Sequence, residues 1–271
     1  MFQPRRWTAR RVEYVAGKPE DVRKESIRIG CAGWSLRAGQ SPLFGDGDSQ
    51  LARYATRFDA VEINSSFHRP HQQKTYARWA ASVPADFLFA VKMPRTITHD
   101  ARLLGAGNAM TRFCDEVAGL GAKLGVVLVQ LPPGLAFDAR IAHAFFAALR
   151  RRTAAPIACE PRHATWFAPG VDALWKRHRI ARVAADPPRI ADASHVGGAG
   201  PLRYWRWHGS PRMYYSAYDD AALAALAAQM RTQASAGDLA WCIFDNTALG
   251  HAVTDAIRLQ ALCAGDADGT R

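Results

Sequence analysis

The stretch Phe87–Lys92, with the sequence FLFAVK, is an apolar run that ends in one charged residue. Three other apolar runs end in a similar way, with Glu62, Glu160 and Asp245 at or next to their last positions. Parallel strands that alternate with helices bring their carboxyl ends to one face of the molecule, where enzymes of this architecture hold their active sites. We therefore expect these four charged side chains to converge on one site.

Strand-like runs of this kind alternate with helical segments along the chain. The strands are expected at residues 27–32, 60–64, 87–92, 125–130, 157–160, 181–185, 202–207 and 241–245. The helices are expected at residues 49–57, 72–82, 108–123, 139–152, 171–179, 221–232 and 247–262. Residues 187–201 are rich in proline and glycine, which favours a loop in place of the sixth crossover helix. Eight strands in this order predict an α/β fold, a single-domain TIM-type (β/α)8 barrel.

The predicted barrel occupies residues 27–263, between a basic N-terminal extension at 1–26 and a flexible C-terminal tail at 264–271. The composition, 49% hydrophobic and 22% charged residues in a chain of 271, is that of a globular protein. No apolar run is long enough to cross a bilayer, and the first residues lack the apolar segment of a secretory signal. We expect a cytoplasmic protein with no membrane partner.

Five cysteines are odd in number and widely spaced, which indicates reduced thiols. Cys31, Cys159 and Cys242 lie inside apolar runs, where a thiol commonly serves as a small hydrophobic group. Most of the cysteines are therefore expected in the core.

A net charge of +11 raises the question of a nucleic-acid partner, because clustered cations gain affinity by releasing counterions from phosphates. The arginines are scattered over most of the predicted helices, with local clusters only at residues 5–11 and 150–152. This distribution favours a composition bias over a binding stripe. Nucleic acid is an alternative partner, and a small polar or anionic molecule is the leading one.

Several strings in the chain resemble the YecE-like family, a domain of unknown function numbered 72. They are IGCAGWS at 29–35, VEINSSF at 61–67, FAVKMPR at 89–95, QLPP at 130–133, EPRH at 160–163, HG at 208–209 and FDNT at 244–247. The resemblance covers about residues 27–263 and implies a TIM-type barrel with no settled activity, and a fold alone does not define a reaction. His68 stands where the family usually has tyrosine, which implies different hydrogen bonding at that position.

The predicted catalytic residues are Glu62, Lys92 and Glu160. Carboxylates beside an amine in a partly desolvated mouth shift one another's pKa values, so Glu62 and Glu160 suit acid–base chemistry. Three roles are open for Lys92, which are to bind an anion, to form a Schiff base, or to neutralise one of the two glutamates.

Other side chains near the same face are candidates for binding a ligand. Arg162 and Arg206 are expected to hold an anion together with Lys92. The loops after strands seven and eight often form a phosphate site in barrels, and there Asn246 either contacts the ligand or caps the next helix. Aromatic groups near this face offer a stacking wall. The ligand-binding candidates are Trp34, Asn64, His68, Gln130, Arg162, Arg206, His208, Tyr215, Asp245 and Asn246.

The sequence identifies no cofactor. Enough oxygen and nitrogen donors are present for a divalent metal, but their spacing matches no metal-binding signature, so a metal is an alternative that the sequence does not favour. These donors are Glu62, His99, Glu160, His163, Asp186, His208 and Asp245.

Three functions are consistent with these observations. The leading hypothesis is an enzyme that binds a small polar anionic ligand, such as a sugar, phosphate or nucleotide-like molecule, and uses carboxylate acid–base chemistry. The second is a metal-assisted phosphodiesterase or nucleic-acid processing protein, which the positive charge suggests. The third is a non-catalytic protein that binds a ligand in the same pocket.

Overall fold

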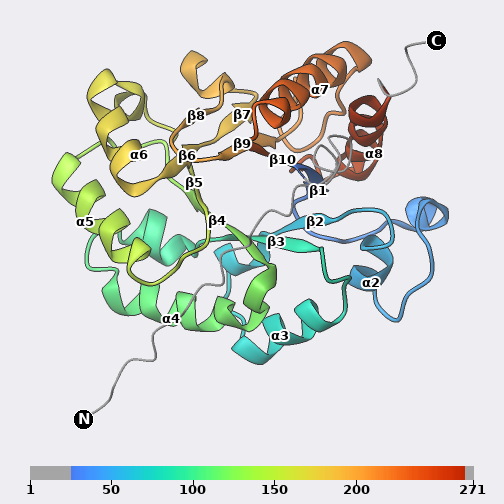
Figure 1. Ribbon diagram of the computed structural model, residues 1–271, viewed down its shortest axis with the longest axis horizontal. Coiled ribbons are helices and arrows are strands. Elements are labelled where there is room, and N and C mark those ends of the chain that lie inside the picture. Colours follow the sequence, from blue (N-terminus) through green and yellow to red (C-terminus); the bar gives the residue numbers. More distant parts are fainter. Residues whose placement is uncertain (1–25, 266–271) are drawn as a thin grey trace.

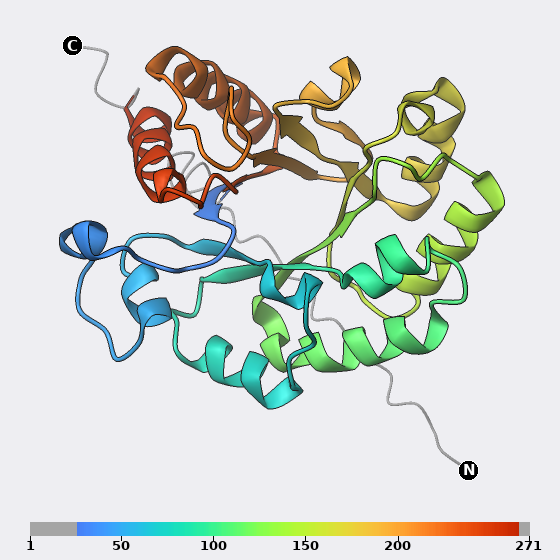
Figure 2. The same cartoon turned by 180° about the vertical axis from the view of Figure 1, so that it is seen from behind.

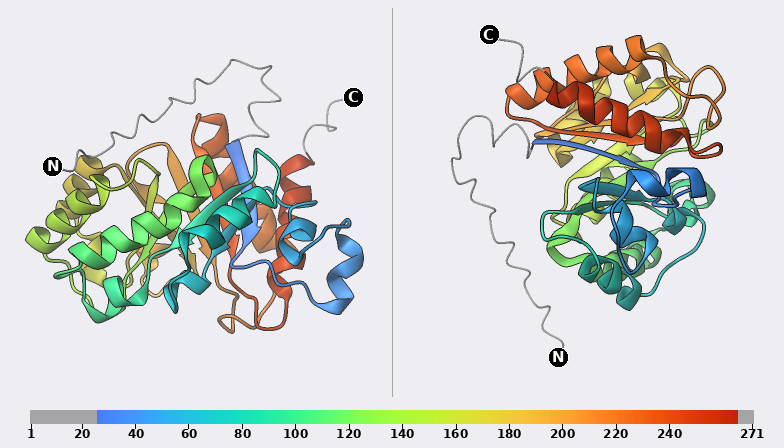
Figure 3. Two further views of the ribbon diagram at one scale, coloured as in Figure 1. Left: turned by 90° about the horizontal axis from the view of Figure 1, so that it is seen from below. Right: turned by 90° about the vertical axis from the view of Figure 1, so that its right-hand side faces the viewer.

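A computed structural model describes residues 26–265 of the chain. Nearly all of the predicted N-terminal extension and all but the first two residues of the predicted tail lie outside the described residues. Within them, strands alternate with helices in a mixed α/β fold, and the helices surround the strands (Figures 1 and 2). Helices α7 (Asp220–Ser235) and α8 (His251–Ala264) lie on one side of the strands, and α3 (Gln73–Ala81) and α4 (Gly107–Val117) lie on the opposite side (Figure 3).

The strands form two hydrogen-bonded sheets, with the orders β1-β10-β9-β7 and β2-β3-β4-β5-β6-β8. Neighbouring strands are parallel except β8, which is antiparallel to β6. The strands are β1 Ile27–Cys31, β2 Ala60–Ile63, β3 Leu88–Lys92, β4 Leu124–Gln130, β5 Ile157–Glu160, β6 Ile180–Arg182, β7 Ala184–Asp186, β8 Gly197–Gly198, β9 Leu202–Trp207 and β10 Leu239–Phe244.

The α-helices follow the strands in the predicted order. They are α2 Gln50–Tyr54, α3 Gln73–Ala81, α4 Gly107–Val117, α5 Ala139–Arg150, α6 Asp172–His178, α7 Asp220–Ser235 and α8 His251–Ala264. Short 3-10 turns occupy Ala38–Leu43, Ser65–Phe67, Ala118–Lys123, Ala164–Phe167, Pro169–Val171 and Ala191–Ser194, and a π turn occupies Thr96–Asp100. No helix among the described residues has the length and apolar character needed to cross a membrane.

The parallel α/β arrangement confirms the predicted class, but the hydrogen bonds do not close the strands into one eight-stranded barrel. The predicted sixth strand is split at Val183 into β6, which pairs with β5, and β7, which pairs with β9 in the other sheet. The two sheets meet a second time between the end of β1 and β2, where one parallel bridge joins Ala32 to Glu62. No α-helix lies between β7 and β9, as predicted, and this connection holds a 3-10 turn and β8.

Two predicted helix boundaries differ most from the structure. The helix expected over residues 108–123 ends at Val117, and the 3-10 turn that follows contains Gly121 at a φ of 56°, which an α-helix excludes. The last helix begins at His251 instead of Thr247, directly after Gly250 at a φ of 86°.

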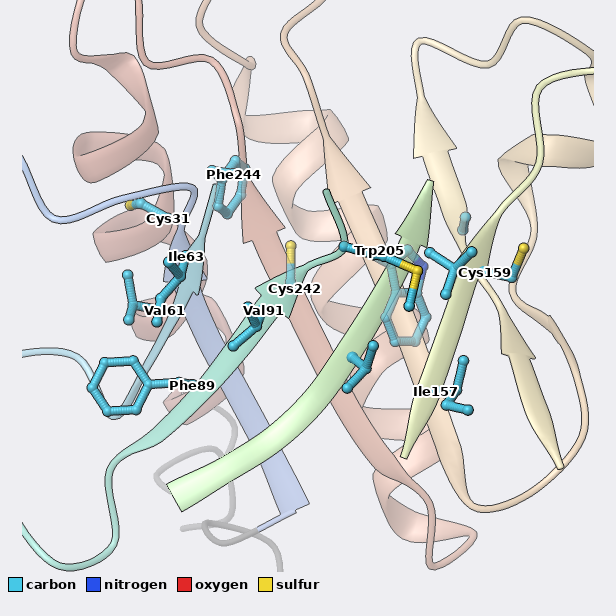
Figure 4. Packing of buried hydrophobic residues seen from close by; sticks show 14 of the residues in the cluster. Cys31, Val61, Ile63, Phe89, Val91, Ile157, Cys159, Trp205, Cys242 and Phe244 are labelled. Carbon is cyan, nitrogen blue, oxygen red and sulfur yellow. The ribbon is translucent and has the colours of Figure 1, made fainter. Parts of the chain in front are cut away.

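Side chains in the strands alternate between two apolar layers. Outward residues such as Val61, Val91 and Trp205 pack beneath the helices (Figure 4). The opposite positions form a second cluster built almost entirely from strand residues, including Ala60 and Ala90. This alternation follows from the two-residue repeat of a strand.

The predicted core thiols are confirmed for Cys31, Cys159 and Cys242, which are buried in the outer layer. Burial raises the pKa of the Cys31 thiol to about 12, so this group stays protonated near neutral pH.

A close contact joins β1 to β2 at the junction between the two sheets. The Tyr54 hydroxyl donates a 2.9 Å hydrogen bond to the Ala60 carbonyl and accepts a 2.9 Å bond from the Cys31 N–H. A Cβ atom at Gly30 would lie 2.1 Å from the same Ala60 oxygen. Only glycine allows the two strands to approach this closely.

Replacing Gly30 by alanine should therefore destabilise the fold. We expect Gly30→Ala to lower the free energy of unfolding by about 1–3 kcal/mol, because the added methyl group forces β1 away from β2. Urea unfolding at pH 7 measures the change. Gly39→Ala is the matched control, since a Cβ there meets nothing within 4 Å. Equal losses in the two variants would show that the junction is not tightly packed.

Candidate functional site

The polar residues of the predicted site share one register with the inner apolar layer. Glu62 stands two positions after Ala60, and Lys92 stands two positions after Ala90. The same spacing holds for Gln130, Glu160, Arg206 and Asp245. Since side chains on one face of a strand repeat every second residue, these groups continue the inner face at the carboxyl ends of their strands.

The guanidinium of Arg206 on β9 is fully buried at the centre of this group. It binds both oxygens of Glu62, with Nη2–Oε1 at 2.6 Å and Nε–Oε2 at 2.9 Å. Its Nη1 lies 3.2 Å from Oε2 of Glu160, and its Nη2 lies 3.1 Å from Oδ2 of Asp245. Burial alone would lower the pKa of Arg206, but the three carboxylates hold it well above its ordinary value. One arginine thus joins β2, β5 and the end of β10.

Glu62 is fully buried, and both of its oxygens are already bonded. Besides Arg206, the Tyr204 hydroxyl donates to Oε2 at 3.1 Å. Hydrogen bonds to the protein thus occupy both oxygens of Glu62, and the side chain has no contact with solvent. The geometry favours a positioning role for Glu62 over proton transfer to a substrate.

Glu160 borders a small pocket beside the central group of charges. Its Oε1 accepts two bonds from Arg162, at 2.8 and 2.7 Å, and its Oε2 accepts one from Gln130 at 2.9 Å. Burial raises the pKa of this carboxyl, but Arg162 and Arg206 outweigh that effect and bring it well below its usual range. Glu160 is therefore ionised near neutral pH.

His208 connects two of the carboxylates. Its Nδ1 lies 3.0 Å from Oδ2 of Asp245, whereas its Nε2 lies 3.4 Å from Oε1 of Glu160 and has no hydrogen-bond partner among the described residues. Burial would lower the pKa of His208, but the bond to Asp245 and the proximity of Glu160 raise it overall. The pKa of Asp245, which burial would raise, is lowered by Arg206 and His208. The imidazole is thus placed to carry a proton between the two carboxylates.

Lys92, at the end of β3, is 6% exposed and forms no ion pair with a carboxylate of residues 26–265. Its Nζ lies 4.1 Å from the centre of the Phe67 ring. Burial and, secondly, the charge of Arg206 lower the pKa of Lys92 to about 8. Direct neutralisation of Glu62 or Glu160, one of the three roles that the sequence left open, is therefore performed by Arg206 and Arg162 instead.

A pocket of about 10 Å³, room for about one water molecule, opens beside Glu160 and His208. Arg162, Arg189 and Met213 also line it. His99 lies near several of these positive groups. Burial and then the charges of Lys92, Arg162 and Arg95 lower its pKa to about 4.

Comparison with known proteins identifies the family of this chain. The model described as "Protein of unknown function DUF72" matches residues 28–270. The chain belongs to the DUF72 family. This match confirms the relationship that the sequence motifs indicated.

Relatives and solved structures of DUF72 proteins are similar to this chain. The UPF0759 protein YecE of Escherichia coli K12 is 31% identical over 86 residues, and the UPF0759 protein YunF of Bacillus subtilis is 26% identical over 151 residues. These matches cover 32% and 53% of this chain, and the same shares of the two relatives.

Two solved DUF72 structures share the fold. The Enterococcus faecalis protein EF0366 has a TM-score of 0.71 at 21% identity, over 88% of this chain and 95% of its own. The Thermotoga maritima protein TM1631 has a TM-score of 0.70 at 20% identity, over 87% and 98%. At these identities the likeness shows the fold alone.

Three predicted ligand contacts of this DUF72 chain are half-buried or exposed side chains. Asn64 is half-buried, and its Oδ1 has no hydrogen-bond partner among the described residues. Trp34 is half-buried and packs edge-on against Trp79, with ring centres 5.1 Å apart. His68 is exposed and touches Phe67 edge-on, so its imidazole faces outward.

The two candidates in the later loops have local partners. Tyr215 is 41% exposed and stacks under the Arg212 guanidinium at 4.1 Å. Asn246 is buried, and its amide donates to the Ser216 carbonyl at 2.9 Å and to Asp255 at 2.8 Å. Because α8 begins only at His251, the predicted helix cap at Asn246 is wrong. Asn246 instead holds the loop after β9 against α8.

Sequence reasoning named Arg206 as a holder of the ligand, whereas its bonds go to three carboxylates of the protein. It missed Tyr204 and Arg189. Tyr204 stands two residues before Arg206 on β9, so the strand register contained the signal that both face inward. Arg189 lies in the irregular segment after β7, where no periodicity predicts a direction.

Four of the metal-ligand candidates, Glu62, Glu160, His208 and Asp245, lie together around Arg206, and the other three have partners elsewhere. His163 bonds to Thr165, Asp186 accepts from the Tyr218 hydroxyl, and His99 bonds to Thr98. Within residues 26–265, no group of three histidine, cysteine or acidic side chains has the arrangement of a metal site. The carboxylates near the centre are already bonded to guanidinium groups, so this donor set does not fit a divalent ion.

If Glu62 holds Arg206 in place, removing its charge should destabilise the fold. We expect Glu62→Gln to lower the free energy of unfolding by about 3–5 kcal/mol, because it leaves Arg206 with one fewer buried countercharge. Chemical denaturation measures the loss. Asp100→Asn is the control, since its ion pair with Arg95 is half exposed and worth less than about 1 kcal/mol. A stable Glu62→Gln protein would contradict the positioning role.

The buried, protonated amine of Lys92 should lower the free energy of unfolding at neutral pH. Its folded-state pKa of about 8 lies below the ordinary 10.5, so the protonated amine costs folding energy below pH 8, and that cost fades as the pH rises toward 10.5. We expect Lys92→Met to raise the free energy of unfolding by about 1–3 kcal/mol at pH 7 and by much less at pH 10. Urea unfolding at both pH values tests this. Lys74 is exposed, so Lys74→Met should not raise the free energy of unfolding. A lower free energy of unfolding in Lys92→Met at pH 7 would refute the destabilising effect of Lys92.

Proposed function

We propose that this protein is an enzyme that binds a small polar anion at the carboxyl ends of its strands. The observation that carries the proposal is Lys92, a nearly buried cation that forms no ion pair with a carboxylate of the described residues. Glu62, Glu160 and Asp245 are matched in charge by Arg206, Arg162 and Lys92, and a protonated His208 adds one more positive charge. A bound anion would balance this excess.

In this proposal, the residues beside the pocket have different roles. Lys92 and Arg162 contact the anionic group, with Arg189 on the outer side of the pocket. His208 exchanges a proton with the bound molecule, and Glu160 and Asp245 stabilise its charged form. Glu62 and Arg206 hold these groups in place from below.

The proposal includes a barrel scaffold. We propose that the two sheets are halves of a distorted TIM-type barrel, in which Ala32–Glu62 and the continuity of β6 with β7 mark the two junctions. The bridge at one junction and the single residue between β6 and β7 at the other support this arrangement. In such barrels the carboxyl ends of the strands form the active site.

A ligand screen by thermal unfolding tests the binding. We expect inorganic phosphate, sugar phosphates or small carboxylic acids to raise the apparent Tm of the wild type, since ligand at 100 times its Kd contributes about 2.7 kcal/mol. The rise should be lost in Lys92→Met and Arg162→Gln, each compared with its own ligand-free Tm. Arg112→Gln is the control, because its side chain is 71% exposed on α4.

Three outcomes separate the candidate functions. Equal stabilisation of wild type and both site variants would refute the anion site. Stabilisation by single-stranded DNA or a divalent metal, but by no small anion, would favour the phosphodiesterase alternative. Binding that depends on Lys92, with no turnover of any bound compound, would favour the non-catalytic ligand-binding protein.

A further inference from the structure

Lys92 differs from the other lysines that the structure describes. Lys123 donates to the Ala80 and Val83 carbonyls, at 2.6 and 2.7 Å. Lys74 and Lys176 are exposed on helices. Lys92 alone among these four is buried and without a hydrogen bond from Nζ to the described residues, and it rests on the face of Phe67.

These surroundings make an amine nucleophilic. An aromatic face and burial remove water from Nζ, and the neighbouring Arg206 disfavours a second positive charge. Desolvation and a nearby cation are the two means by which proteins activate a lysine toward carbonyl groups. With a pKa of about 8, roughly a tenth of the Lys92 side chains carry the neutral amine at pH 7.

Proton carriers for such a reaction are present in the same group of side chains. Glu160 and Asp245 lie close enough to Lys92 to raise its pKa slightly against the larger effects. His208 bridges these two carboxylates, and its Nε2 has no hydrogen-bond partner among the described residues. Imine formation needs one group that gives a proton to the departing oxygen, and the imidazolium of His208 is placed for that task.

We propose that Lys92 forms an imine with the carbonyl carbon of a small anionic aldehyde or ketone, such as a 2-oxo acid. The neutral amine attacks the carbonyl carbon and forms the N–C bond, which gives a carbinolamine after proton transfer from nitrogen to oxygen. The C–O bond then breaks as His208 protonates the hydroxyl, water leaves, and the C=N bond forms. No oxidant or reductant is consumed. This inference rests on the proposed anion site, since Arg162 holds the carboxylate of the same molecule.

Reductive trapping tests the imine directly. The full chain is incubated with glyoxylate, pyruvate or dihydroxyacetone phosphate and sodium cyanoborohydride, and the adduct is located by intact mass and peptide mapping. We expect one equivalent on Lys92, formed at least tenfold faster than on Lys74 or Lys176, faster at pH 8 than at pH 6, and slowed by inorganic phosphate. Lys92→Arg, which keeps the positive charge, should give no adduct at this position, while Lys74→Arg should behave like the wild type.

The same variants separate this inference from the proposed function. If phosphate stabilises the wild type and Lys92→Arg but no compound is trapped at Lys92, the imine is refuted and the anion site stands. If neither stabilisation nor trapping occurs, both fail. Adducts spread equally over the exposed lysines would refute a selective role for Lys92.

Discussion

The buried guanidinium of Arg206 organises the carboxyl end of this fold. It binds Glu62 on β2, Glu160 on β5 and Asp245 after β10, and therefore joins strands from both sheets. Burying four charges is costly unless each is paired and hydrogen-bonded, and here one planar group with several donors satisfies three acids at once. Tyr204, Gln130, Arg162 and His208 complete the bonding of those acids. The positions of all these side chains depend on Arg206.

This arrangement leaves Lys92 as the exception. A buried amine without a countercharge lowers stability, and such groups occur where a protein binds or transforms a charged molecule. Arginines bind the carboxylates that sequence reasoning assigned to catalysis, so our proposals assign the chemistry to Lys92 and to His208. Burial and then the charges of Lys92, Arg162 and Arg95 lower the pKa of His99, and Lys92 and Arg162 belong to the proposed anion site.

Much of the fold was accessible from local patterns. Short apolar runs and the helical segments between them predicted the positions of the strands along the chain, and a run rich in proline and glycine predicted the connection without an α-helix. The single closed ring was not confirmed, because the sixth strand divides at Val183 and its halves pair with different sheets. Strand pairing depends on the twist and closure of the whole sheet, and no single segment contains that information.

For the candidate site too, local sequence determined one part and the tertiary structure determined the other. The order of residues along each strand determined that Glu62, Lys92, Glu160, Arg206 and Asp245 face inward at the carboxyl ends, because alternation is a property of the extended backbone. The tertiary structure decided which cation meets which carboxylate, since residues such as Glu62 and Arg206, 144 positions apart, become neighbours only across the packed interior. That choice pairs Arg206 with three acids and leaves Lys92 unpaired.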